Sequence, residues 1–323
     1  MNKLMLATEQ GIVSFEHKDT GWHESLHGLG EQQVTCISAR KGLILAGTTN
    51  GVFHSEDRGQ TWREANNGLN TRHVRWIAFH PDVSNLVCAG TEPANIFISH
   101  NDGNSWRALP EVAQLRDRFK WSLPYSPEAG CVRGFAFHGP RLYAAVEVGG
   151  VLVSEDQGET WSLAGGSDGK PSFAGPPEPF VYPDVHSLEV HPSSPDLVYA
   201  PTGGGFYRSL DGGKTWKLFY DCYCRAVWVD PQNPDHMILG PAEGVDRNGR
   251  IEESQDGGET WSMASNGLQV PWRRGMVERF FRAGEELFAI LSTGEVLSTS
   301  LSTLEWKHIF PNIKNANAMA EII

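Results

Sequence analysis

Arginine, glutamate and histidine residues recur at comparable points of the sequence, at the beginning or end of short apolar segments. One set stands at the beginning of such segments and consists of Cys36, Arg75, Arg133, His186, Arg225 and Glu278. A second set stands at the end of the segments that follow and consists of Glu92, Glu147 and Thr202. Guanidinium groups bind carboxylates and phosphates through paired N–H donors, and carboxylates and imidazoles transfer protons. These residue types suit the binding and conversion of a small anion, provided that the fold brings them together.

The two glutamates of the second set allow opposite interpretations. If Glu92 and Glu147 face each other, they could act as the acid and the base of glycosidic cleavage. If each carboxylate instead pairs with a neighbouring arginine, its pKa is lowered and it is a poor acid. The sequence leaves both interpretations open.

His186 also has several possible roles. With Asp184 two residues before it, it suits a base that abstracts a proton beside a carboxylate held by arginines, with Tyr125 or Tyr182 as the acid. Together with Glu92 and Glu147 it provides ligand types for a divalent metal, although no short-spaced metal motif is present and no cofactor is required. A purely structural hydrogen-bonding role is the remaining alternative.

A repeated eight-residue phrase indicates which elements position these residues. It reads SEDRGQTW at 55–62, SHNDGNSW at 99–106, SEDQGETW at 154–161, SLDGGKTW at 209–216 and SQDGGETW at 254–261. In a tight turn the aspartate accepts backbone hydrogen bonds, the glycine adopts a positive φ, and the tryptophan buries a large ring. Each phrase follows three apolar, strand-like segments, so each repeat predicts one four-stranded antiparallel sheet.

The phrase resembles the Asp-box, or BNR repeat, and the resemblance covers nearly the whole chain. With eroded copies ending at Trp22 and Trp306, seven repeats imply an all-β, seven-bladed β-propeller that spans residues 1–323 as one domain, with the Asp-boxes between strands three and four. The N-terminal segment aligns with second and third strands. The C-terminal strand 316–323 is therefore expected to complete the first blade and close the ring.

In a propeller of this kind, the first strands begin and the second strands end on the same face, which we call the upper face. Both residue sets are therefore expected at the upper mouth of the central channel. The long loops 107–131 and 162–184 are expected to fold over this mouth, which is the usual place for binding residues. The predicted substrate-binding residues are Arg75, Arg133, Arg225, Glu278, Trp121, Tyr182, Trp272 and Arg274. The predicted catalytic residues are His186, Glu147 and Glu92.

Composition restricts the partners and the compartment. The formal charge of −12 argues against a nucleic-acid partner. Five scattered cysteines do not form a disulfide framework, and the sequence contains neither a long apolar run nor a recognisable signal segment, so we expect a cytoplasmic protein without a membrane partner.

The resemblance implies functions of two classes. Sialidases among Asp-box propellers hold a carboxylate with three arginines and use a tyrosine–glutamate pair, and Arg75, Arg133 and Arg225 are similar in type to that triad. Sialidases, however, have six blades and an Arg-Ile-Pro signature that this chain lacks. Xyloglucanases pair two propellers, and photosystem assembly factors use an arginine patch. We therefore predict a hydrolase or lyase that acts on an acidic sugar, and the alternative is a non-catalytic propeller whose arginine-rich face docks a protein partner.

Overall fold

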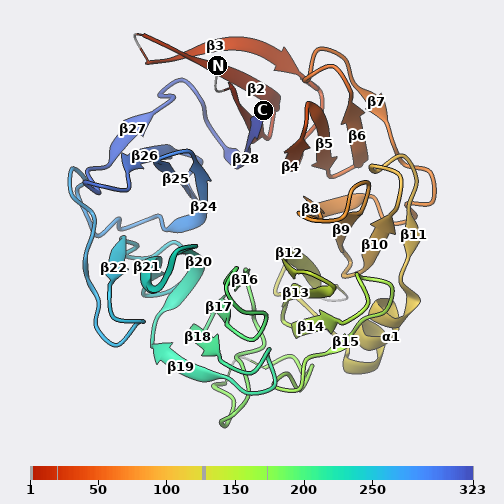
Figure 1. The fold of residues 1–323 in the computed structure, drawn as a ribbon, viewed down its shortest axis with the longest axis vertical. Helices are drawn as coiled ribbons and strands as arrows, with labels where there is room; N and C mark the ends of the chain where they lie inside the picture. Colours follow the sequence, from red (N-terminus) through yellow and green to blue (C-terminus); the bar gives the residue numbers. More distant parts are fainter. Residues whose placement is uncertain (1–2, 20, 126–128, 173, 323) are drawn as a thin grey trace.

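The computed structural model describes residues 3–19, 21–125, 129–172 and 174–322, so residues 126–128 and 173 of the two predicted loops lie outside the described part. Seven four-stranded antiparallel sheets stand in a ring (Figure 1). The predicted seven-bladed β-propeller is confirmed.

The strands follow the repeats, and the first strand of each blade lines the channel. Blade 1 contains β28 (Ala316–Ile322), β1 (Lys3–Thr8), β2 (Gly11–Lys18) and β3 (Gly21–Gly28). Blade 2 contains β4 (Val34–Arg40), β5 (Leu43–Thr48), β6 (Gly51–Ser55) and β7 (Arg63–Glu64). Blade 3 contains β8 (His73–Phe79), β9 (Val87–Glu92), β10 (Ile96–Ser99) and β11 (Arg107–Ala108). Blade 4 contains β12 (Cys131–His138), β13 (Arg141–Glu147), β14 (Gly150–Ser154) and β15 (Ser162–Leu163).

The remaining blades have the same order. Blade 5 contains β16 (Glu189–Val190), β17 (Val198–Thr202), β18 (Gly205–Ser209) and β19 (Lys217–Tyr220). Blade 6 contains β20 (Tyr223–Asp230), β21 (Asn233–Ala242), β22 (Glu252–Ser254) and β23 (Ser262–Met263). Blade 7 contains β24 (Val277–Ala283), β25 (Glu286–Leu291), β26 (Val296–Ser300) and β27 (Lys307–Ile309).

The two ends of the chain share blade 1. β28 pairs antiparallel with β1, with Lys3 opposite Ile322 and Ala7 opposite Ala318 (Figure 1). This pairing covers the edge that β1 would otherwise expose and closes the ring. The predicted closure by the C-terminal strand is confirmed.

The Asp-box forms the expected turn between strands three and four. In blade 4, one carboxylate oxygen of Asp156 accepts the backbone N–H of Thr160 at 2.9 Å, and the other accepts the Thr160 hydroxyl at 2.7 Å. Gly158 has a φ of 85° and donates its N–H to the Ser154 hydroxyl. The Trp161 indole N–H donates back to the Gly158 carbonyl. The motif therefore satisfies its own polar groups and leaves the indole ring to pack between blades.

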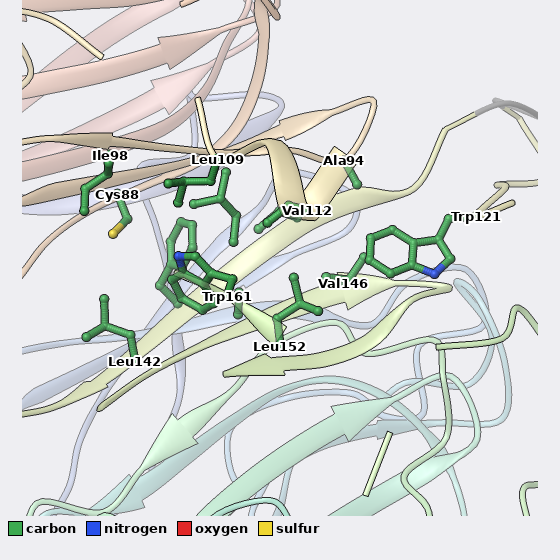
Figure 2. Close-up of a cluster of buried hydrophobic side chains, with 14 of the residues drawn as sticks. Cys88, Ala94, Ile98, Leu109, Val112, Trp121, Leu142, Val146, Leu152 and Trp161 are labelled. Atoms are coloured by element: carbon green, nitrogen blue, oxygen red, sulfur yellow. The ribbon is translucent and has the colours of Figure 1, made fainter. Parts of the chain in front are cut away.

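The core consists of apolar clusters between neighbouring blades. Figure 2 shows the cluster between blades 3 and 4, where Trp161 lies between Cys88 and Ile98 of blade 3 and Leu142 and Leu152 of blade 4. Trp161 is only 4% exposed. Burying an aromatic ring of this size contributes several kcal/mol, roughly 3–5 by comparison with Trp→Ala substitutions. The repeat thus stabilises the contact from one blade to the next.

One of the two long loops contains an unexpected helix, α1 (Pro110–Phe119). Pro110 in its first turn and Glu111 near its N-terminus favour a helix start, and Val112 packs into the core cluster of blades 3 and 4. α1 lies at the outer edge of the ring, away from the channel (Figure 1). The expectation that the whole loop folds over the mouth is therefore wrong for this segment.

Blade 5 departs from the regular pattern at its inner strand. Its inner strand, β16, is only Glu189–Val190, so residues 185–188 lie before the regular strand. His186 donates its N–H to the Pro201 carbonyl, and Pro201 has no N–H to return the ladder bond. The proline thus explains why the regular ladder is interrupted next to His186.

Two further observations bear on the sequence expectations. All five cysteines are free thiols. In the described part of the chain, no helix has the length and apolar character that crossing a membrane requires.

Candidate functional site

A β-bulge interrupts six of the inner strands close to the upper mouth. The pairing registers of β28, β4, β8, β12, β20 and β24 with their neighbours each skip one or two residues at this point. The skipped residues are Asn317, Thr35, Arg75, Arg133, Arg225 with Ala226, and Glu278. Bulges re-aim side chains and are frequent beside functional sites. The repeated bulge explains how side chains that are distant in the sequence come to face one channel.

The bulge in β4 shows that Cys36 was wrongly included among the residues expected at the channel. In blade 2 the skipped residue is Thr35, whereas Cys36 is 2% exposed and packs in the apolar cluster between blades 2 and 3. Burial raises the pKa of the Cys36 thiol to about 11. Cys36 is therefore a core residue, and Thr35 takes its place at the channel.

The upper mouth contains a cavity of about 450 Å³. Its charged and aromatic lining consists of Glu9, His73, Arg75, Tyr125, Arg133, Glu147, Arg225, Glu278 and Arg279. Blades 7, 1 and 2 contribute mostly neutral polar residues, namely Gln33, Thr35, Thr49, Ser292, Asn315 and Asn317. Cavities of this size accommodate small ligands. The wall that contains the arginines suits an anion, and the neutral polar wall of blades 7, 1 and 2 suits hydroxyl groups.

Arg133 is the centre of an ion-pair network that crosses the channel. Its guanidinium lies 3.5 Å from a Glu147 oxygen and 3.3 Å from a Glu278 oxygen. Arg225 pairs with the other oxygen of Glu278. Burial acts to raise the pKa of Glu278, but Arg225 and Arg133 outweigh it and hold that pKa below its usual value. Glu278 is therefore a fixed anion between two arginines.

Glu92 and Glu147 do not form a facing pair of catalytic carboxylates. Glu92 lies 3.4 Å from Arg75 and 3.8 Å from His73, and it does not line the cavity. Glu147 lines the cavity, where it accepts the Tyr125 hydroxyl at 3.3 Å. Tyr125 as a residue is 62% exposed. Partial burial of its hydroxyl, and next the charge of Glu147, raise the pKa of Tyr125, which keeps the phenol protonated. The structure thus places a tyrosine–glutamate pair, rather than two glutamates, at the mouth.

His186 lies behind the cavity wall and contacts it through Arg133. It is 3% exposed, its Nδ1 lies 3.4 Å from an Arg133 nitrogen, and its Nε2 lies 3.5 Å from an Asp184 oxygen. Burial, followed by Arg133 and Arg225, lowers the pKa of His186 well below its usual value. Burial, followed by Glu147, raises the pKa of Asp184 to about 7. His186 is thus a neutral ring that holds Arg133, which favours a positioning role.

Glu147, Asp184 and His186 have the residue types and spacing of a metal site, because one ligand atom of each lies within 4.8 Å of the others. The predicted ligand Glu92 is not in this group, since it pairs with Arg75. Arg133 contacts both Glu147 and Nδ1 of His186. Because an Arg133 N–H can only donate to Nδ1, the proton of the neutral ring is on Nε2 and faces Asp184. The group does not fit a bound cation, because the Arg133 guanidinium beside it is positively charged and the Nε2–H of His186 points toward its centre.

Four predicted ligand contacts lie away from the cavity. Trp121 is 1% exposed, packs near Val146 in the core and donates its indole N–H to the Gly169 carbonyl at 2.7 Å (Figure 2). Tyr182 is 7% exposed and packs between blades 4 and 5. Trp272 packs against the cluster of blades 6 and 7, and Arg274 is exposed on the same loop. The aromatic rings of these loops cover blade edges instead of the cavity. The length and aromatic content of the loops were therefore not evidence of ligand contacts.

Arg279 was missed by sequence reasoning although it directly follows Glu278. Its guanidinium carbon lies 4.2 Å above the Trp76 ring, across the channel from its own blade. Burial lowers the pKa of Arg279 to about 10, and the like charges of Arg133 and Arg75 act in the same direction. Among the described residues, no carboxylate forms an ion pair with it, unlike Arg75, Arg133 and Arg225. Arg279 lines the cavity because its side chain extends across the channel, and the sequence pattern does not indicate this.

Comparisons with known proteins agree with this architecture. The family model described as BNR/Asp-box repeat matches residues 207–218. An oligoxyloglucan-reducing end-specific xyloglucanase from Emericella nidulans is 26% identical over 196 residues, which cover 52% of this chain and 24% of that protein. The chain thus spans about a quarter of the length of this relative.

Two solved structures illustrate the range of similar propellers. An ancestral GH74 enzyme superposes with a TM-score of 0.62 at 18% identity, over 90% of this chain and 38% of that one. YCF48 bound to D1 peptide superposes with a TM-score of 0.62 at 14% identity, over 93% of this chain and 89% of that one. At these identities the similarity shows the fold alone, and a shared fold does not transfer a function. The ring of seven blades and these similarities show that the chain is a seven-bladed β-propeller, and one of its repeats matches the BNR/Asp-box model.

Proposed function

We propose that this protein is a hydrolase that cleaves a small, carboxylate-bearing sugar at the upper mouth of its channel. The observation that carries the proposal is the cavity of about 450 Å³ that Arg75, Arg133, Arg225 and Arg279 share with the Tyr125–Glu147 pair. Arginine forks bind carboxylates with matched geometry, and the neutral polar wall of blades 7, 1 and 2 suits sugar hydroxyls. The similarity to a xyloglucanase supports a carbohydrate substrate.

Tyr125 and Glu147 are the residues assigned to the reaction. Some glycoside hydrolases use a tyrosine nucleophile in place of a carboxylate. Here Glu147 takes the phenol proton at 3.3 Å as the Tyr125 oxygen bonds to the anomeric carbon and the glycosidic C–O bond breaks, and the leaving oxygen takes a proton from solvent. Water then attacks the anomeric carbon and loses a proton to solvent, the bond from the sugar to the Tyr125 oxygen breaks, and Glu147 returns its proton to that oxygen. Arg133 holds the Glu147 carboxylate from the other side at 3.5 Å.

Hydrolysis is favoured over elimination because of where His186 lies. Elimination needs a base that reaches a carbon-bound proton of the substrate. His186 does not line the cavity, and its Nδ1 is engaged by Arg133. Its proposed role is therefore to position Arg133.

The test compares chromogenic glycosides of an acidic sugar, such as glucuronic acid or N-acetylneuraminic acid, with those of neutral glucose. We expect turnover of an acidic glycoside only. Tyr125→Phe and Glu147→Gln should each lower kcat by about 100-fold or more. Tyr182→Phe is the matched control, because this buried tyrosine does not face the cavity, and it should retain full activity. Absence of turnover with every acidic glycoside, or full activity of Tyr125→Phe, would refute the proposal.

A second candidate is docking of an acidic protein segment. It is favoured by the similarity to YCF48, which was solved bound to a D1 peptide, and by the exposed Arg274 at the rim. Binding of an acidic peptide that Arg274→Ser weakens and Tyr125→Phe leaves unchanged would support docking. The opposite pattern, with a small acidic sugar as the ligand, would support the hydrolase.

A further inference from the structure

The charges around the channel do not balance at Arg279. Glu92 pairs with Arg75, and Glu147 and Glu278 pair with Arg133 and Arg225. Of these four arginines, Arg279 is the one for which no carboxylate of the described residues forms an ion pair. Glu9, the remaining carboxylate of the cavity lining, accepts a hydrogen bond from the Asn315 side chain and, within the described chain, does not pair with an arginine. His73 in the cavity lining and His186 behind it add no charge, since burial lowers the pKa of both rings. Asp184 lies 3.5 Å from Nε2 of His186 and forms no ion pair with Arg279 among the described residues.

The surroundings of Arg279 make this unpaired charge costly. Two of the charged groups that act on it, Arg133 and Arg75, are cations, and one, Glu278, is already shared by two arginines. Trp76 provides a cation–π contact, which offsets only part of the lost hydration. A buried charge without a partner is otherwise avoided in proteins. The guanidinium nevertheless borders the open cavity, where an anion can reach it.

We propose that Arg279 and Arg75 form the seat for the carboxylate of the ligand, and that this seat accepts one negative charge. Arg279 reaches across the channel to Trp76, which directly follows Arg75, so the two guanidiniums lie against the same blade. The inference rests on the proposed function for the identity of the ligand as an acidic sugar. The location and the charge of the seat rest on Arg279 alone.

The seat also orients the ligand. Seated at Arg279 and Arg75, the sugar lies between the neutral wall formed by Asn315 and Asn317 and the opposite wall with Tyr125 and Glu147. A dianion would bring a second charge that no unpaired arginine of the described mouth neutralises. The predicted ligand is therefore a monocarboxylate, and phosphate dianions are disfavoured.

The experiment uses Arg279→Met in the full chain, because methionine keeps the packing on Trp76 and removes the charge. Two opposite effects are expected. Thermal unfolding of the ligand-free variant should occur at a higher Tm than in the unsubstituted protein, since a costly charge is gone. Calorimetric affinity for glucuronate should fall by about 10- to 100-fold, which corresponds to the loss of a charge-assisted hydrogen bond. Arg282→Met is the matched control on the same strand, because among the described residues the polar partners of Arg282 are Glu285 at 4.0 Å and the Gly284 carbonyl, and it does not line the cavity.

A second measurement separates the seat from the enzymatic proposal. Crystals soaked in bromide should show an anomalous peak between Arg279 and Arg75, and glucuronate should compete with bromide, whereas glucose and phosphate should not. A bromide peak without any glycoside turnover would leave the seat intact and refute the hydrolase. A lower Tm for Arg279→Met, unchanged glucuronate affinity, or a halide bound elsewhere in the mouth would overturn the seat.

Discussion

Replacing Arg133 by methionine tests whether the ion-pair network holds the channel mouth together. Arg133 lies 3.3–3.5 Å from Glu278, Glu147 and the His186 ring, and its side chain is 14% exposed. At such distances, an effective dielectric constant near 20 gives about 5 kcal/mol of attraction per ion pair before desolvation is subtracted. Removing one partner of a buried pair costs about 3–5 kcal/mol, because the other charge remains buried.

We expect the lower end of that range for Arg133→Met, about 3 kcal/mol. Glu278 keeps Arg225 as its partner, so it is not orphaned. Among the described residues, the Tyr125 hydroxyl is the hydrogen-bond partner that Glu147 keeps, and Glu147 therefore accounts for most of the loss. The substitution also removes repulsion between Arg133 and the neighbouring arginines, which offsets part of the cost.

Urea unfolding followed by tryptophan fluorescence measures this loss as a lower midpoint at an unchanged m-value. The exposed Arg282→Met control should stay within about 0.5 kcal/mol of the unsubstituted protein. Adding Glu147→Gln to Arg133→Met should recover part of the stability, since the orphaned charge is then gone. A loss below about 1 kcal/mol, or a double variant less stable than Arg133→Met, would refute the reasoning.

Two further predictions concern closure of the ring and pH. Deleting the chain from Ala316 onward removes β28 and exposes the edge of β1, so we expect size-exclusion chromatography to show aggregates. A synthetic peptide of the deleted residues should restore the monomer in part. An unaffected monomer would contradict closure of the ring by this strand. Asp184 has a folded pKa raised to about 7 from 3.8, so the stability it contributes is complete below pH 3.8 and is lost as the pH rises to about 7. Asp184→Asn should therefore flatten the decline of unfolding free energy between pH 4 and 7, and an unchanged slope would show that Asp184 titrates normally.

Sequence reasoning reached the charged mouth but not the details of contact. The shared strand pattern predicted that Arg75, Arg133, Arg225 and Glu278 meet at one face, and the structure brings them to one cavity. The same pattern did not reveal which carboxylates face solvent, because alternation along a strand does not specify the next blade. Glu92 and Glu147 occupy equivalent strand ends, yet only Glu147 faces the cavity.

The long loops show a related limit. Their length and aromatic content predicted a cover for the mouth, whereas helix α1 and the Trp121 ring pack against blade edges instead. A buried aromatic ring and a ligand-stacking ring look alike in sequence, since both require a large apolar surface.

The sequence by itself determined the architecture of this protein, because each Asp-box is a local structure whose serine, aspartate, glycine and threonine satisfy one another within eight residues. Seven copies with tryptophans between them left few alternatives to a closed ring. Only the tertiary structure decided the chemistry of the mouth: which arginine is left unpaired, and that a tyrosine rather than a second carboxylate meets Glu147. These outcomes depend on bulges and on side chains that reach across the channel, and contacts between distant blades have no local signature.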